Sequence, residues 1–328
     1  MHHSDKTRIL QGSMWTKVLF STMIISIAGI GILQAVSVYA TNTSNTKNIP
    51  IAEAATPFVA PLVYVAPFPQ VEVSAQGLFL GRVDLTSGTI TPLYVKNEHQ
   101  ILPIASISKL ITTYVAIQSH NLNDQFKITD WAVSGPWPSR KFSVGDIYTL
   151  QELLEASLVE SNNDAARVLA SSLGERRFVQ NMNLAAVALS LSETALFSAD
   201  GTNRFVEDRF VENTSTAHDI AQLIVNLYKQ APDLLSVTTQ PQVEVSDVTG
   251  KKIFTAYTTN KLMSFFSDGY TLLGGKTGTS EVEQKHLVLL FKDPKGVAYV
   301  AVVLDSKDNF VDMQAVLNTL VTYSVGQI

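Results

Sequence analysis

The order of strand and helix patterns along the chain constrains its fold more than any single motif does. Two apolar strand patterns around a turn open the body, in the segment GLFLGRVDLTSGTITPLYVKN that begins at Gly77. A second such pair, HLVLLFKDPKGVAYVAVVLD, begins at His286 and is followed by a helix pattern over Phe310–Tyr323. Because hairpins of this kind form antiparallel sheet, we expect both ends of the body to contribute strands to one sheet.

Helical patterns fill the interval between the two hairpins. We predict helices over Ser106–Ser119, Leu150–Val159, Asp164–Leu173, Phe178–Leu189 and Thr216–Lys229, and a further strand pair at QVEVS and KIFTAY, residues 242–246 and 252–257. The order of strands, helices and strands predicts an α/β (α+β) body, in which an antiparallel sheet is covered by helices. A helical lobe, roughly residues 107–265, is inserted between the strands, and a cleft is expected where the two lobes meet.

An uncharged apolar run, Val18–Ala40, lies near the N-terminus and is preceded by the cations Lys6, Arg8 and Lys17. At 1.5 Å per residue the run would span about 34 Å as a helix, which is enough to cross a bilayer. Its last three residues also resemble a signal-peptidase cleavage site. We therefore predict that residues 1–40 are either a signal peptide or an N-terminal membrane anchor.

The residues that follow decide the domain organisation. Residues 41–72 are rich in Pro, Ala and Asn without helical or strand periodicity, and we predict a flexible linker there. The body then comprises residues 73–328. Because the positive charges precede the apolar run, we expect the body to be exported and to lie on the outer side of the cytoplasmic membrane, anchored or released after signal cleavage.

The composition argues against several classes of function. The net charge is −5 and no long basic run occurs, so the chain lacks the electrostatic pattern of a nucleic-acid-binding protein. No cysteine is present, which excludes disulfides, zinc–thiolate sites and thiol nucleophiles. The six histidines form neither an HxxxH nor an HExxH pattern, so we predict no metal site and no cofactor.

The segment PIASISKL, which contains Ser106, Ser108 and Lys109, carries the first chemical signal. Residues three apart share a helix face, so Ser106 can contact Lys109 whereas Ser108 points elsewhere. A lysine can take the proton of a serine only when it is neutral. Lowering a lysine pKa from about 10.4 to about 7 costs roughly 4.6 kcal/mol, which burial and a second cation can supply. The spacing alone is a weak signal, because Ser44 and Lys47 repeat it in the predicted linker.

Two further segments strengthen this signal. SNND begins at Ser161 between two predicted helices, and KTGTS begins at Lys276 and leads into a strand. Ser-x-x-Lys, Ser-x-Asn and Lys-Thr-Gly in this order resemble the serine D-Ala-D-Ala carboxypeptidase family, the low-molecular-mass penicillin-binding proteins. The resemblance covers Val73 to about Ser324 and includes LVESNNDAARVLASSLG and FVENTSTAHDIAQL. It implies a β-lactamase/transpeptidase-like fold, with residues 73–328 as a penicillin-binding D,D-peptidase catalytic domain.

The resemblance also implies a role for each motif residue. Ser106 would be acylated, Lys109 would be its general base, and Ser161 would relay a proton to the leaving amine. The residues implied to bind the substrate are Asn163, Lys276, Thr277, Gly278 and Thr279, and the backbone N–H groups of Ser106 and Thr279 would form an oxyanion hole. Lys276 is also expected to be the second cation that Lys109 requires.

These residues predict a serine D,D-peptidase, a D-alanyl-D-alanine carboxypeptidase, that acts on peptidoglycan stem peptides and is inhibited by β-lactams. Two departures keep alternatives open. Thr279-Ser280 follow Lys-Thr-Gly, where relatives often carry an aromatic residue or His and then Thr, and no arginine follows Arg209 to anchor the terminal carboxylate. A D,D-endopeptidase that cuts crosslinks is therefore one alternative. A β-lactamase is the other, although no glutamate between the Ser-x-Asn and Lys-Thr-Gly motifs begins the Glu-x-x-Leu-Asn motif of class A enzymes.

Overall fold

The computed structural model describes residues 67–206, 208–267, 269–280 and 283–325. The predicted signal or anchor segment and the predicted linker up to residue 66 lie outside the described residues. Within the described ranges, no helix combines the length and the apolar character that crossing a membrane requires.

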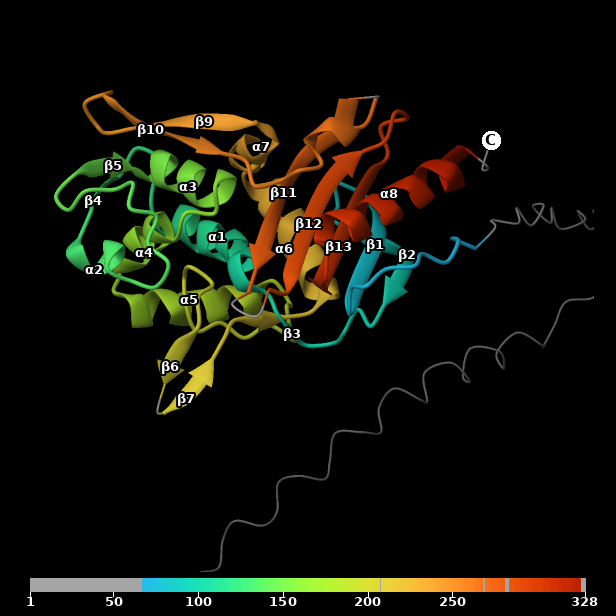
Figure 1. The fold of residues 1–328 in the computed structure, drawn as a ribbon, viewed down its shortest axis with the longest axis horizontal. Coiled ribbons are helices and arrows are strands. Elements are labelled where there is room, and N and C mark those ends of the chain that lie inside the picture. Colours follow the sequence, from blue (N-terminus) through green and yellow to red (C-terminus); the bar gives the residue numbers. More distant parts are fainter. Residues whose placement is uncertain (1–66, 207, 268, 281–282, 326–328) are drawn as a thin grey trace, which may run out of the picture. The chain divides into compact units, whose positions relative to one another are not determined.

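An antiparallel sheet of five strands forms the centre of the body, in the order β11-β12-β13-β1-β2 (Figure 1). Its strands are β1 (Gly77–Val83), β2 (Ile90–Lys96), β11 (Thr271–Thr279), β12 (Lys285–Lys292) and β13 (Ala298–Ser306). The N-terminal and C-terminal hairpins join through β1 and β13, which pair from Gly77 opposite Leu304 to Val83 opposite Ala298. The predicted sheet built from both ends of the body is therefore confirmed, and β11 lies at one of its edges.

The strands β1, β12 and β13 are buried on both faces of the sheet, because apolar side chains point to each face in turn. On β13, Val300 and Val302 belong to one hydrophobic core, whereas Ala301 and Val303 belong to a second. The covering helices are α1 (Lys109–Ser119) and α6 (Ala217–Gln230) in the first core and α8 (Asn309–Val325) in the second. Figure 1 shows α8 along one face of the sheet and α6 behind the other. Burial on both faces accounts for continuous apolar runs such as HLVLLF in β12.

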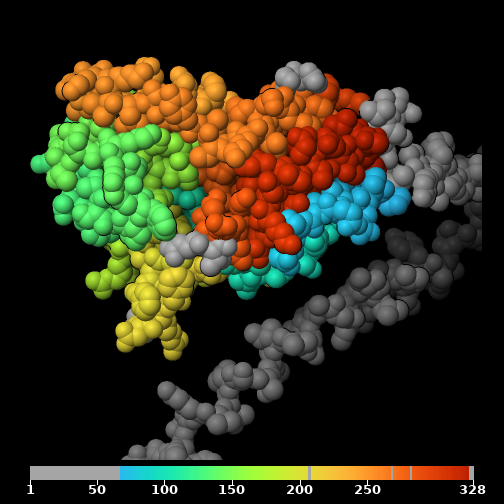
Figure 2. All heavy atoms as spheres, viewed as in Figure 1, coloured from blue at the N-terminus to red at the C-terminus, as the bar shows by residue number. Residues whose placement is uncertain are grey.

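The interval between β2 and β11 forms the helical lobe. Its other helices are α2 (Asp130–Val133), α3 (Leu150–Val159), α4 (Asn163–Ser171), α5 (Glu175–Ala188) and α7 (Pro232–Ser236), with 3₁₀ turns η1 (Ala105–Ser108), η2 (Val237–Thr239) and η3 (Met263–Ser267). Its strand pairs are β3 (Leu102–Pro103) with β8 (Thr214–Ser215), β4 (Gln125–Lys127) with β5 (Ile147–Thr149), β6 (Arg204–Val206) with β7 (Arg209–Val211), and β9 (Gln242–Ser246) with β10 (Lys252–Tyr257). Apart from α6, which covers one face of the sheet, the lobe lies beside the sheet, and β6 and β7 project from the lobe (Figure 2).

The predicted helices and main strands are confirmed, with ends that differ by a few residues at most positions. The helix α6 begins as expected, because Thr216 Oγ1 accepts a hydrogen bond from the Asp219 backbone N–H at 3.1 Å. One boundary was wrong: the helix predicted from Ser106 starts as a 3₁₀ turn, and α-helical structure begins at Lys109. The chain enters this turn through Ala105 with a left-handed φ of 46°, which hydrophobic periodicity does not reveal.

His286, on β12 opposite Gly278 of β11, is completely buried. Its Nδ1 accepts a hydrogen bond from the Asp305 backbone N–H at 3.1 Å, and burial lowers the pKa of the ring to about 4. In the unfolded chain a histidine has a pKa of about 6.5, so the unfolded state binds more protons between pH 4 and 6.5. The free energy of unfolding therefore falls as the pH is lowered through this window.

We expect His286→Gln to remove this part of the pH dependence. Between pH 6.5 and 5, the free energy of unfolding of the wild type should fall by about 1.6 kcal/mol more than that of the variant. Urea unfolding at both pH values measures the difference. The same comparison at pH 8, where the ring is neutral in both states, gives the cost of the substitution itself. If the free energy of unfolding falls equally in the two proteins between pH 6.5 and 5, a group other than His286 causes the pH dependence.

Candidate active site

The Ser-x-x-Lys motif lies at the start of α1, where the helical lobe meets β11 and β12. Ser106 is in η1, and its Oγ lies 2.9 Å from Nζ of Lys109. Ser108 is buried, and its Oγ donates instead to the carbonyl of Ala105. The structure thus pairs Lys109 with Ser106 and turns Ser108 away from it.

Gly201 fixes the backbone of this turn from the other side. It has a left-handed φ of 83°, and a Cβ placed on it would lie 2.9 Å from the backbone nitrogen of Ser106. Any side chain there would push against the peptide between Ala105 and Ser106, so the position requires glycine for both its conformation and its close approach. The loop that contains Asp200 and Gly201 is therefore part of the wall around Ser106.

Nζ of Lys109 has three neighbours, at 2.9 Å from Ser106 Oγ, 2.7 Å from Asn163 Oδ1 and 2.5 Å from the Asp200 carbonyl oxygen. Asn163 presents its oxygen because its Nδ2 donates to the carbonyl of Trp137 at 3.2 Å. Two of the three neighbours can therefore only accept. A neutral Lys109 gives its two N–H groups to them and directs its lone pair at the Ser106 hydroxyl, which is the geometry of a general base.

Burial lowers the pKa of Lys109 to about 7, since none of its side chain is exposed to solvent. The Asp200 carboxylate raises this pKa and the Arg167 guanidinium lowers it. Arg167 is thus a cation near Lys109 that we did not predict, besides the expected Lys276. Lys109 and Lys276 also repel each other, since burial, and then the charge of Lys109, lower the pKa of Lys276 well below its usual range.

The Ser-x-Asn and Lys-Thr-Gly motifs meet through Ser161 and Lys276. Ser161 lies in the connection between α3 and α4 and has a left-handed φ of 63°. Nζ of Lys276 donates to Ser161 Oγ at 2.9 Å and to the carbonyl of Thr277 at 2.8 Å. Because the Ser161 hydroxyl accepts from Lys276, its own hydrogen can be donated to a third group.

The strand β11 carries the whole Lys-Thr-Gly motif and Thr279. In the described sheet it pairs only with β12, so its outer edge can hydrogen-bond with an extended peptide. A Cβ on Gly278 would lie 2.9 Å from the carbonyl oxygen of Ile104, which shows how closely β11 approaches the turn that holds Ser106. The side chain of Thr279 is exposed beside this approach. The structure therefore brings all three motifs to one place.

Three buried charged residues at this place were not predicted from the sequence. Arg167, Asp164 and Asp200 are at most 1% exposed, and Arg167 forms ion pairs with both carboxylates, at 2.5 and 2.6 Å. Asp164 and Arg167 carried a signal, because they are charged residues three apart in the otherwise small and apolar segment DAARVLA that follows NN. Asp200 carried none, since its partner is 33 residues away.

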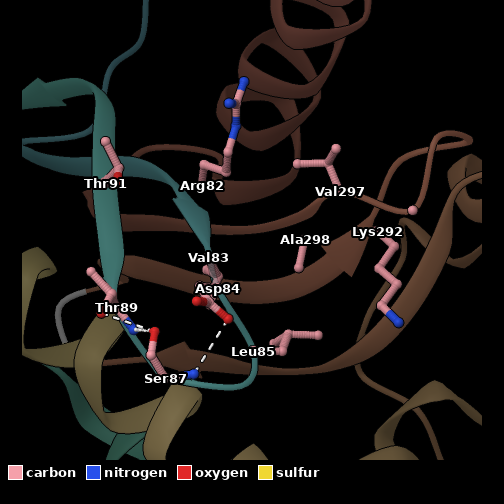
Figure 3. A pocket seen from close by; sticks show the side chains of 11 residues that line it. Arg82, Val83, Asp84, Leu85, Ser87, Thr89, Thr91, Lys292, Val297 and Ala298 are labelled. Carbon is pink, nitrogen blue, oxygen red and sulfur yellow. Dashed lines mark hydrogen bonds between the residues drawn. The ribbon is translucent and has the colours of Figure 1, made fainter.

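A hollow of about 510 Å³ lies away from these motifs (Figure 3). Asp84 and Ala298 are among the residues that line it, near the turn after β1 and the start of β13. Lys292, which also lines it, pairs with Thr271, at the far end of β11 from Thr279. The hollow is therefore separate from the candidate active site. Among the described residues, no group of three His, Asp or Glu side chains could hold a metal ion.

Comparison with known proteins shows the family to which the chain belongs. Residues 66–308 match the family model described as D-alanyl-D-alanine carboxypeptidase. Over 160 residues the chain is 31% identical to a D-alanyl-D-alanine endopeptidase of Pseudomonas aeruginosa, which covers 47% of this chain and 48% of that protein. Over 206 residues it is 26% identical to a D-alanyl-D-alanine carboxypeptidase of Mycobacterium tuberculosis, covering 62% of this chain and 67% of that protein. The first alignment thus spans about half the length of the relative.

The fold also has a close counterpart among solved structures. The crystal structure of a D-alanyl-D-alanine carboxypeptidase from Mycobacterium tuberculosis superposes with a TM-score of 0.67 at 23% identity, covering 80% of this chain and 95% of that one. At this identity the likeness concerns the fold. It confirms the predicted architecture of an antiparallel sheet covered by helices with an inserted helical lobe.

Proposed function

Because this chain belongs to the D-alanyl-D-alanine carboxypeptidase family, we propose that it is a serine D,D-peptidase that removes the terminal D-alanine of peptidoglycan stem peptides. The proposed intermediate is an acyl-enzyme on Ser106. The observation that carries the proposal is the placement of Lys109, buried, with its Nζ between Ser106 Oγ and two acceptors. Such a lysine can be neutral at physiological pH and can take the serine proton.

In the acylation step, Ser106 Oγ attacks the carbonyl carbon of the penultimate D-alanine. A C–O bond forms, the serine proton passes to Nζ of Lys109, and the carbonyl oxygen becomes an oxyanion. The backbone N–H groups of Ser106 and Thr279 are proposed to donate to this oxyanion. Removal of one such donor typically costs about 3 to 4 kcal/mol of transition-state stabilisation.

Collapse of the tetrahedral intermediate breaks the C–N bond, and the departing D-alanine nitrogen needs a proton. Ser161 donates this proton and takes one in return from Lys276, with which it is hydrogen-bonded. The proton gained by Lys109 then restores the charge of Lys276, so Lys109 is neutral again. In the second step water attacks the ester, Lys109 accepts its proton, and Ser106 Oγ leaves and recovers that proton.

The groups around β11 support binding of an extended peptide that ends in a carboxylate. We infer that the stem peptide pairs with the outer edge of β11, next to Thr277 and Thr279. A substrate carboxylate there would favour the charged form of Lys276. Asn163 keeps one Nδ2 hydrogen for a substrate carbonyl, because the other is given to Trp137.

Cleavage of crosslinks is a second candidate activity. The Pseudomonas aeruginosa relative is named an endopeptidase, and the sequence has no arginine after Arg209 to bind a terminal carboxylate. Purified muropeptides distinguish the two activities by the masses of the products. Pentapeptide monomers that lose one D-alanine support the carboxypeptidase, and crosslinked dimers that become monomers support the endopeptidase. If neither changes while benzylpenicillin still forms an adduct, the proposed peptidase activity is wrong.

We expect β-lactams to acylate the enzyme and to be released slowly. The bulky penicilloyl group stays in the site after acylation and blocks the approach of water on the side of Lys109. The two carboxylates near Lys109 cannot replace it as the base, because both are engaged: Asp200 with Arg167 and Thr202, Asp164 with Arg167 and Ser139. Nitrocefin should therefore give a stoichiometric burst followed by a slow phase. Rapid and sustained nitrocefin hydrolysis without peptide cleavage would favour a β-lactamase instead.

We expect the rate of acylation to rise with pH through about 7. Lys109 acts as a base only after losing its proton, and its pKa is about 7. At pH 5 about 1% of the molecules would carry neutral Lys109, so acylation should be roughly 100-fold slower than on the alkaline plateau. The rate of benzylpenicillin adduct formation, followed by intact-mass spectrometry from pH 5 to 9, measures this. A rate that is flat over this range would exclude Lys109 as the titrating base.

We also infer that the protein works outside the cytoplasmic membrane. The inference is supported by Lys6, Arg8 and Lys17, which precede the apolar run Val18–Ala40. N-terminal sequencing of the protein from cells distinguishes the two fates of this run. A sequence that starts at Thr41 indicates a cleaved signal, and an intact N-terminus in the membrane fraction indicates an anchor.

A further inference from the structure

Arg167 is a buried cation that the proposed reaction does not use. Its side chain, on α4, is 1% exposed, and its guanidinium donates four hydrogen bonds. Two acceptors are the carboxylates of Asp164 and Asp200, at 2.5 and 2.6 Å. The other two are the backbone carbonyls of Ala132 and Pro136, at 2.7 and 2.9 Å. A buried charge needs paired partners of this kind, and here they come from three separate segments of the chain.

The segment between α2 and α3 closes around this guanidinium. A Cβ on Gly135 would lie 2.6 Å from Cζ of Arg167, so only glycine allows the approach. A few residues further on, the backbone N–H and hydroxyl of Ser139 donate to Asp164 Oδ2 at 2.8 and 2.6 Å. Between them Trp137 has a left-handed φ of 51°, which a bulky residue adopts only where its surroundings hold it. The ion pair of Arg167 and Asp164 therefore keeps this segment in one conformation.

The same cluster fixes both acceptors of Lys109. One acceptor is the backbone carbonyl of Asp200. The side-chain carboxylate of the same residue accepts a hydrogen bond from Arg167 at Oδ2. The other is Asn163 Oδ1, and the amide is oriented by its bond to the Trp137 carbonyl, in the segment that Arg167 holds. Arg167 thus supports one acceptor directly and the other through the segment around it.

We propose that Arg167 is a positioning residue, which fixes the two acceptors of Lys109 so that the lone pair of the neutral amine is directed at Ser106. The proposal rests on the proposed role of Lys109 as general base. Arg167 acts through the Asp200 carbonyl and the Asn163 amide, and its four hydrogen bonds go to protein acceptors and not to the reacting atoms.

The charges around Lys109 give this role a signature. The charged groups that act on it or on its neighbours are Asp200, Arg167, Lys276, Asp164 and Arg204. Asp200 raises the pKa of Lys109 and Arg167 lowers it. Removal of the Arg167 charge alone should therefore raise the pKa of Lys109, and removal of the Asp200 charge alone should lower it. These shifts show that the two charges act on Lys109, and the maximal rate of folded Arg167→Lys, which keeps the charge, shows whether the geometry of the guanidinium positions the acceptors.

The test is the pH dependence of benzylpenicillin acylation in Arg167→Gln, Asp200→Asn and the double variant. Benzylpenicillin reports on Ser106 and Lys109 without requiring that stem peptides be cleaved. In Arg167→Gln the apparent pKa of acylation should rise by about one unit and the rate at pH 7 should fall on the order of tenfold. In Asp200→Asn the apparent pKa should fall. In the double variant it should return toward the wild-type value while the maximal rate stays low.

Two further variants control for charge and for folding. Arg176→Gln removes the same charge at an exposed position on α5 and should leave the profile unchanged. Arg167→Lys keeps the positive charge but loses the planar guanidinium. It should therefore keep the apparent pKa of acylation and lose part of the maximal acylation rate. If circular dichroism shows that Arg167→Gln does not fold, Asp200→Asn and Arg167→Lys carry the test.

The outcomes separate the positioning role from the proposed function. A wild-type rate and profile in Arg167→Gln, or in both Asp200→Asn and Arg167→Lys, would overturn the positioning role. Equal losses of rate in all variants with an unshifted pKa would also overturn it. If the expected shifts occur but the wild type leaves muropeptides intact, the positioning role holds and the proposed peptidase activity is wrong.

Discussion

Replacement of Ser106 by alanine should abolish the benzylpenicillin adduct and lower the rate of peptide cleavage by roughly 10⁴- to 10⁶-fold. The reason is that Ser106 Oγ is the hydroxyl in contact with Nζ of the buried Lys109, the proposed general base, so its removal takes away the atom that is acylated. The measurements are D-alanine release or crosslink cleavage from muropeptides, and intact-mass spectrometry after benzylpenicillin.

The matched control is Ser108→Ala, two residues along the same turn. Ser108 Oγ is buried and donates to the Ala105 carbonyl, so this variant should still be acylated. An adduct that persists in Ser106→Ala would show that Ser106 is not the nucleophile. If the adduct is also lost in Ser108→Ala, the nucleophile is Ser108.

Replacement of Lys109 by arginine should lower acylation by on the order of 10³-fold although it keeps the positive charge. A guanidinium cannot lose its proton at any relevant pH, whereas burial lowers the pKa of Lys109 to about 7. The rate of benzylpenicillin acylation at pH 8 measures the loss, because most wild-type Lys109 is neutral there.

Two variants show whether the loss of acylation in Lys109→Arg follows from the loss of a neutral base. Lys109→Met has almost the same length and no basic nitrogen, and it should lose acylation to a similar extent. Lys252→Arg, at an exposed position on β10, should behave as the wild type. Thermal melting checks that each variant is folded. Substantial acylation by folded Lys109→Arg would exclude proton transfer to this residue.

The parts of the site that are local in sequence could be predicted from it. Ser106 and Lys109 are three residues apart, and the turn and helix that contain them place the two side chains in contact. The sheet could be predicted because its strands carry long apolar runs at both ends of the body. The strand pairs with two or three residues per strand could not be predicted, because two or three residues are too few to show the alternation of apolar and polar side chains.

The groups that set the properties of Lys109 are not local in sequence, so their place beside Lys109 could not be predicted, although the spacing of Asp164 and Arg167 indicated a pair. Asp200 binds Lys109 through its backbone carbonyl, which every residue type has, so this contact cannot be predicted from the sequence. The burial of Arg167 depends on two carboxylates that tertiary packing brings together. Lys276 could be predicted as a second cation because it stands in a motif, whereas no motif contains Arg167.

The central claim is that this chain forms an acyl-enzyme on Ser106, and peptide mapping of the benzylpenicillin adduct tests it most directly. The structure predicts one added benzylpenicilloyl mass per molecule, located by fragmentation on Ser106 and missing from Lys109→Arg. An adduct on Ser161, Ser108 or any other residue would contradict the claim, as would the absence of any adduct in a preparation that cleaves muropeptides.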